Sequence, residues 1–105
     1  MDHANARRRR SDFRASRTGD GTYDLAGELD ISTADVLQGI LDQEPAHELT
    51  LDAAGLDFLD SSGMRVLLSA VVRGRSVTVR SPSPRVERTL RMAGVDRLPG
   101  LRIVE

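Results

Sequence analysis

Apolar and polar positions alternate along two short runs early in the chain, residues 13–17 and 22–27. Alternation with a period of two places every second side chain on one face of a strand. The sequence Gly19-Asp20-Gly21 separates the two runs, and glycine and aspartate suit the backbone of a tight turn. The pattern therefore predicts a β-hairpin.

A helical spacing follows this hairpin. Four apolar residues share one face of the expected helix: Val36, Leu37, Ile40 and Leu41. Ser32 precedes them and Asp35 falls in the first turn, so we expect Ser32 to be the N-cap. Pro45 should end this helix, because the residue before a proline is pushed out of the helical region.

The second half of the chain continues with alternating strands and helices. Alternating residues predict three further strands, at 48–53, 76–81 and 101–104. The apolar faces of the two helices between them are Met64, Leu67, Leu68 and Val71 in the first and Val86, Leu90 and Ala93 in the second. Ser83 and Pro84 suit the start of the second helix, and Gly74 and Gly94 are expected to end the two.

The predicted order of elements is strand, strand, helix, strand, helix, strand, helix, strand. Strands that alternate with helices after an opening hairpin imply an α/β fold with a mixed β-sheet, its helices on one or both faces. The strand at 48–53 and the nearly continuous apolar run at 66–72 belong at the centre of this fold. Residues 59–63, between them, should then be held on rigid elements.

Length and composition fit a single small domain. The chain has 105 residues, of which 39% are hydrophobic and 30% charged, which is the usual size of one hydrophobic core. The absence of cysteine excludes disulfides and thiolate metal sites. No run of 18 apolar residues and no secretory signal pattern occur, so we expect a cytoplasmic protein that does not span a membrane.

The formal net charge of −1 hides an uneven distribution. Residues 1–18 carry six arginines against two aspartates, whereas residues 19–105 carry nine arginines against fourteen acids. The run Arg7–Arg10 lies in a segment without apolar periodicity, so we expect residues 1–11 to be a disordered basic tail and residues 12–105 the folded domain. With neither aromatic interleaving nor a basic surface behind it, this run does not predict direct nucleic-acid binding.

Asp60-Ser61-Ser62-Gly63 is the most informative segment for function. On one interpretation it is only a helix start, in which Asp60 caps the backbone. On the other, hydroxyls in a first helical turn face solvent, where another protein could phosphorylate them. A phosphoryl group adds about −1.5 to −2 charge, which the positive end of the helix dipole tolerates. With Asp60 and Asp30 making the patch acidic, a serine here is a candidate charge switch for binding.

The residues do not predict an enzyme. Neither His3 nor His47 is placed to activate a serine nucleophile. Asp30 and Asp60 without further ligands are too few for a magnesium site or a catalytic pair. No phosphate-binding loop occurs either. We therefore expect no catalytic residue, no metal and no cofactor.

Five segments carry a family resemblance, in the right order: Gly27-Glu28-Leu29-Asp30, Leu49-Thr50-Leu51-Asp52, Phe58 to Met64, Ser81 to Val86 and Leu90 to Val95. Together they resemble the signatures of the STAS domain, most closely those of bacterial anti-sigma factor antagonists. The resemblance covers about residues 12–104. It implies a STAS-type α/β fold.

The resemblance also implies a partner-switching protein. In that family the unphosphorylated antagonist binds an anti-sigma factor that is also a serine kinase, and so releases a sigma factor for transcription. The kinase phosphorylates the antagonist with its own ATP, and a phosphatase reverses the step. The family's phosphorylated serine falls on Ser62, with Ser61 as the alternative. We expect the partner surface to comprise Asp30, Asp60, Ser61, Gly63 and Met64, with Met64 supplying apolar contact.

A second interpretation remains open: a non-switching STAS subunit of a lipid-transport, transporter or stressosome-like assembly. The intact serine pair favours the switch, and the lack of a preceding membrane segment is expected to disfavour a transporter tail. Arg65 departs from the family pattern, in which a small residue often follows the hydrophobic position after the glycine. We therefore expect the partner contacts or the kinase to differ in detail.

Overall fold

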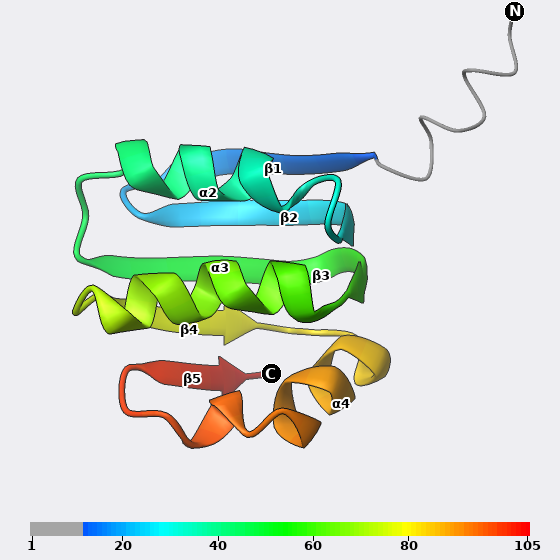
Figure 1. Cartoon of the computed structure of the whole chain (residues 1–105). Helices are drawn as coiled ribbons and strands as arrows, with labels where there is room; N and C mark the ends of the chain where they lie inside the picture. The colour runs from blue at the N-terminus through cyan, green and yellow to red at the C-terminus, as the bar shows by residue number, and fades with distance from the viewer. Residues whose placement is uncertain (1–11) are drawn as a thin grey trace, which may run out of the picture.

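The computed structural model describes residues 12–105. Its elements in chain order are β1 (Phe13–Gly19), β2 (Thr22–Leu29), α2 (Ala34–Gln43), β3 (Glu48–Leu59), α3 (Ser61–Val72), β4 (Ser76–Arg80), α4 (Pro84–Met92), the short 3-10 helix η1 (Val95–Arg97) and β5 (Leu101–Val104) (Figure 1). The expected tail at residues 1–11, with its Arg7–Arg10 run, lies outside the described residues.

The five strands form one mixed sheet in the order β1-β2-β3-β4-β5. β1 and β2 make the expected antiparallel hairpin, and all other neighbours are parallel. Each parallel pair is joined through a helix, and such connections are nearly always right-handed, so the helices fall on the same face. Figure 1 shows α2 and α3 side by side across that face. The predicted α/β fold is confirmed.

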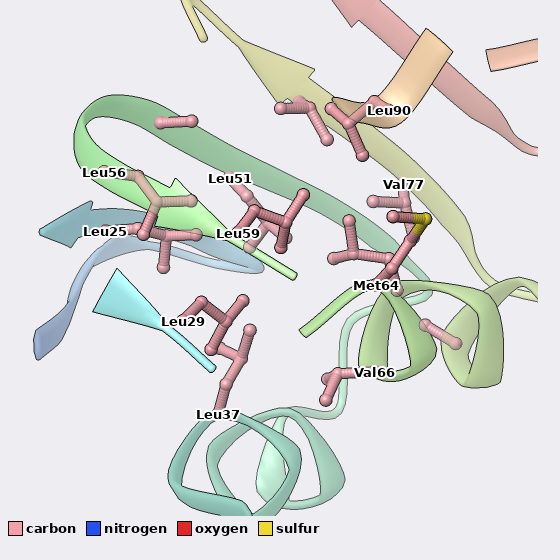
Figure 2. Close-up of a cluster of buried hydrophobic side chains, with 14 of the residues drawn as sticks. Leu25, Leu29, Leu37, Leu51, Leu56, Leu59, Met64, Val66, Val77 and Leu90 are labelled. Atoms are coloured by element: carbon pink, nitrogen blue, oxygen red, sulfur yellow. The ribbon is translucent and has the colours of Figure 1, made fainter. Parts of the chain in front are cut away.

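The core lies between the helices and this one covered face. In β3, Leu49, Leu51 and Ala53 are buried while Thr50 and Asp52 point to the open face, which is polar. A salt bridge of 3.2 Å between Arg80 and Asp52 lies on that open face. Figure 2 shows leucines from β2, β3 and α2 meeting Val66 of α3 and Leu90 of α4 in one cluster.

β3 is longer than the alternation predicts. The predicted strand ends at residue 53, whereas β3 continues to Leu59, with Leu56 and Leu59 both buried. Its pairing with β2 shifts register twice, between Asp24 and Ala26 and between Gly27 and Glu28. A bulge interrupts the period of two, which is why this part of the strand resembles a loop in sequence.

The helix ends agree with the sequence except at the start of α2. Ser83 caps α4, because its Oγ accepts a hydrogen bond from Val86 N at 3.3 Å. Gly74 and Gly94, at the ends of α3 and α4, have φ of 88° and 77°, a conformation that favours glycine. The N-cap position of α2 is Thr33, not Ser32, and its side chain makes no cap hydrogen bond.

A buried carboxylate fixes the other end of α2. The Glu44 side chain is fully buried and accepts hydrogen bonds from Arg17 Nε at 2.8 Å, Tyr23 OH at 2.5 Å and Ala46 N at 3.0 Å. These bonds, that of Arg17 first, lower the pKa of Glu44 to about 2. Arg75 completes the anchor by donating to the carbonyl oxygens of Leu41, Glu44 and Ala46.

Candidate functional site

The parallel pairing of β2 with β3 brings two aspartates to one edge of the sheet. Leu29 and Leu59 are register partners at the carboxyl ends of these strands. Asp30 and Asp60 are the next residues, and Asp60 N donates to Leu29 O at 3.2 Å. Residues that lie 30 positions apart in sequence therefore meet at the point from which α3 begins.

Hydrogen bonds hold the loop that carries Asp30. Its carboxylate oxygen Oδ1 accepts from Ser32 N at 3.0 Å, Ser32 Oγ at 2.8 Å and Thr33 Oγ1 at 3.2 Å. Partial burial raises the pKa of the Asp30 carboxyl, but the bonds from Ser32 and Thr33 outweigh it, so this pKa lies below its ordinary value. Ser32 thus donates hydrogen bonds to Asp30 and does not cap α2.

Asp60 caps α3, as the sequence predicts. Its Oδ1 accepts from Ser62 N at 2.9 Å and from Gly63 N at 3.2 Å. Two of the backbone donors that a helix start leaves unsatisfied are therefore paired. The cap also fixes the direction in which the first turn of α3 leaves the sheet.

Ser61 and Ser62 occupy that first turn with their hydroxyls unengaged. Ser61 is exposed and Ser62 is partly exposed, and neither hydroxyl bonds to any residue in 12–105. Both line a hollow between the starts of α2 and α3, which Ile31, Asp35 and Arg65 also line. The structure thus brings the two serines close to Asp30 and Asp60, on a helical turn that the Asp60 cap holds in place.

Gly63 allows α3 to approach the strand ends closely. A Cβ at this position would lie 2.7 Å from Leu29 Cγ, 2.7 Å from Leu59 Cδ1 and 2.8 Å from Leu29 O. Gly63 is itself buried. The role of Gly63 in the site is therefore to allow a short distance between the serine turn and the strand ends.

The expectation that Met64 supplies apolar contact to a partner is wrong. Its side chain is only 8% exposed and belongs to the hydrophobic core, and Figure 2 shows it within the buried cluster. The residue faces inward because it is the first of the apolar stripe that packs α3 on the sheet. Its neighbours Ser61 and Ser62 keep the outward positions.

The apolar side chain that does stand beside the site is Ile31, which the sequence did not single out. Ile31 is 80% exposed, and Val36 on the first turns of α2 is 50% exposed. Because Ile31 lies between Asp30 and Ser32, it belongs to neither a strand alternation nor a helical stripe. An apolar residue with no face to belong to is the only sequence signal that could have found it.

Two further observations concern the chemistry of the whole described chain. Within residues 12–105, no three histidine, aspartate or glutamate side chains are grouped so that they could hold a metal ion. No helix in this part of the chain has the length and apolar character that crossing a membrane requires. The chemically distinctive feature is the serine pair with its two aspartates.

The fold and site together define a small α/β domain that presents two serines at the carboxyl edge of its parallel strands. A family model described as "Mlab, STAS domain" matches residues 13–105. The chain therefore belongs to the STAS domain family, and the resemblance noted in the sequence is confirmed.

Solved structures share this fold. The anti-sigma factor antagonist SpoIIAA in its unphosphorylated form is 19% identical with a TM-score of 0.66, over 90% of this chain and 89% of that one. SpoIIAA of Bacillus in its phosphorylated form is 18% identical, with a TM-score of 0.61 over 90% and 92%. An anti-sigma factor antagonist from Mycobacterium paratuberculosis is 22% identical, with a TM-score of 0.68 over 87% and 84%.

Proposed function

We propose that this protein is an anti-sigma factor antagonist whose binding is switched off by phosphorylation of Ser62, with Ser61 as the alternative acceptor. The unphosphorylated form binds an anti-sigma factor with serine kinase activity and so releases a sigma factor. A phosphatase removes the phosphate and restores the binding form. The observation that carries the proposal is the pair of unengaged hydroxyls on a rigid, capped turn at the edge of the sheet.

The placement of these hydroxyls suits a switch that leaves the fold intact. A phosphoryl group adds about −1.5 to −2 charge, and the start of α3 tolerates it through the helix dipole. The same charge enters a surface that already carries Asp30 and Asp60. A partner whose surface is matched to the unphosphorylated patch would meet a large local change in potential.

The proposed partner surface contains Asp30, Asp60 and Ser61, and Gly63 supports it from a buried position through the close approach that it allows. Ile31 takes the place of Met64 as the apolar contact, because it is exposed beside the same hollow. The loop that carries Ile31 is held by the hydrogen bonds of Asp30 and Thr33. A preorganised apolar side chain loses little conformational freedom on binding.

The remaining parts of the proposal follow from this role. The protein itself has no catalytic residue, and the nucleotide for phosphorylation is bound by the kinase. Residues 12–105 are the STAS domain, residues 1–11 are a basic tail, and the site of action is the cytoplasm. Contact with nucleic acid belongs to the sigma factor and not to this chain.

A second candidate is a STAS subunit that does not switch, within a lipid-transport, transporter or stressosome-like assembly. The observation that favours it is the description of the matching family model, which names Mlab. The two candidates differ in one respect that is easily measured. Only the antagonist needs a serine at the start of α3 that a partner kinase modifies.

The test is to incubate the protein with candidate anti-sigma factor kinases and ATP, and to map any phosphate by mass spectrometry. We expect phosphate on Ser62 of the wild type and none at that position in Ser62→Ala, with Ser61→Ala as the matched control. In calorimetry, Ser62→Ala should bind the anti-sigma factor with the affinity of the unphosphorylated wild type. Ser62→Glu should bind it at least about tenfold more weakly than the wild type does. Equal affinities of Ser62→Glu and the wild type would contradict the switch.

A further inference from the structure

Arg65 lies one helical turn after the serine pair and lines the same hollow between α2 and α3. We propose that Arg65 binds the phosphoryl group carried by Ser62, or by Ser61, within its own chain and so holds it over the hollow. This inference rests on the proposed function, because it concerns the phosphorylated state. It adds a phosphate-positioning residue at a position where the family pattern often has a small residue.

Helical geometry places the guanidinium within reach. Ser62 and Arg65 are three residues apart, and Ser61 and Arg65 are four apart, which are the two spacings at which side chains on a helix meet. Helical side chains also lean toward the N-terminus of their helix. The side chain of Arg65 therefore inclines toward the first turn, where both hydroxyls lie.

Arg65 is free to take a new partner. Five other arginines of the described chain already bond carboxylates or carbonyl oxygens: Arg17, Arg73, Arg75, Arg80 and Arg91. Arg65 is exposed and makes no hydrogen bond or ion pair with any residue in 12–105. A planar guanidinium that is not engaged elsewhere can form two parallel hydrogen bonds to a phosphate.

The other polar groups around the hollow are not suited to bind the phosphate. Asp30 on the loop before α2, Asp35 on α2 and Asp60 at the cap of α3 would repel a phosphate. The N–H groups of Ser62 and Gly63 already donate to Asp60. Among the described residues that line the hollow, Arg65 is the one cation.

Holding the phosphate there has a consequence for the switch. The group would occupy the hollow beside Ile31, where the proposed partner makes contact, and Arg65 would offset part of its charge. Release of the partner would then follow from the filled space as well as from repulsion.

The test installs phosphoserine at position 62 during translation, so that no kinase is needed. The second pKa of phosphoserine, ordinarily about 6, is read from the phosphorus NMR shift of the wild type, Arg65→Gln and Arg102→Gln. Arg102 is an exposed arginine on β5 and is the control. It pairs with Thr78 and lines a different hollow, together with Thr50 and Ser76, away from the serines. Its substitution changes the net charge equally.

We expect Arg65→Gln to raise that pKa by roughly 0.2 to 0.7 units, the size of a surface ion pair, and Arg102→Gln to leave it unchanged. The Arg65 Nε–H resonance of the wild type should also move when the phosphoserine ionises. An unchanged pKa in Arg65→Gln, or equal shifts in both variants, would overturn the inference. The proposed function fails separately, if no kinase phosphorylates the unmodified protein.

Discussion

At the scale of single residues, the site contains two kinds of residue. Some stabilise the local backbone and are not available to a partner, and others face outward. Asp60 is occupied with the backbone of α3, Thr33 is 3% exposed and bonds Glu28 O at 2.8 Å, and Gly63 has no side chain to place. Ser61, Ser62, Arg65 and Ile31 remain to face outward. Two substitutions separate these two kinds of role.

The first substitution tests the close approach at Gly63. Gly63→Ala puts a Cβ within 2.8 Å of Leu29 O, so backbone must shift, and we expect unfolding to become easier by about 1 to 3 kcal/mol. The measurement is the free energy of unfolding in urea. Gly39→Ala is the control, because a Cβ there meets nothing within 4 Å, and it should stabilise α2 by about 0.5 to 1 kcal/mol. Two variants of equal stability would show that the packing at Gly63 is slack.

The second substitution tests Ile31 as a contact residue. Ile31→Ser should leave the free energy of unfolding within about 0.5 kcal/mol of the wild type, because the side chain is 80% exposed. The affinity of this variant for the cognate anti-sigma factor should fall roughly tenfold or more, because it lacks an apolar side chain that binding would bury.

Val72→Ser is the matched control for this experiment. Val72 is 84% exposed at the last residue of α3, at the opposite end of the helix from the serines. We expect its affinity to equal that of the wild type in calorimetry. Ile31→Ser binding as tightly as Val72→Ser would remove Ile31 from the proposed surface while leaving the role of Ser62 untouched.

At the scale of elements, α2 is held at both ends by polar groups. The Asp30 loop lies before it, and the Glu44, Arg17 and Tyr23 cluster fixes its end. Since the hollow is bounded by α2 and α3, the position of α2 decides the width of the site. The Glu44 anchor is far from the serines in the chain, yet it supports one wall of their surroundings.

This anchor predicts a pH dependence of stability. The pKa of Glu44 falls from 4.5 to about 2 in the folded protein, so its ionised form stabilises the fold above pH 4.5. That contribution is lost as the pH falls from 4.5 toward 2. Chemical unfolding should show Glu44→Gln clearly less stable than the wild type at pH 7, with the difference narrowing toward pH 2. Asp42→Asn, at an exposed ion pair with Arg73, should differ from the wild type by no more than about 1 kcal/mol at pH 7. A constant gap for Glu44→Gln would contradict the prediction.

At the scale of the whole molecule, local patterns predicted the order of elements because alternation and helical spacing are short-range signals. They failed where a distant contact decides the outcome. Ser32 lost its cap role to Asp30, the bulges opposite β2 hid the second half of β3, and Met64 turned into a core that only the sheet completes. Glu44 and Arg17 are 27 residues apart, so no window of sequence could pair them.

The candidate site was accessible from sequence only in part. Asp60, Ser61 and Ser62 are adjacent in the chain, so their shared turn follows from helix-start chemistry. That Asp30 lies beside them depends on the register of β2 against β3. The exposure of Ile31 depends on how its loop is tied.

The Asp60 cap and the buried Gly63 also bear on how quickly such a protein could respond. The serine turn is fixed by backbone hydrogen bonds and by contact with Leu29 and Leu59, so adding or removing a phosphate requires no segment to refold. Lid opening and local unfolding take microseconds to seconds, and the proposed switch requires neither. Under the proposed function, the response time of the circuit is set by enzyme encounters and by partner dissociation.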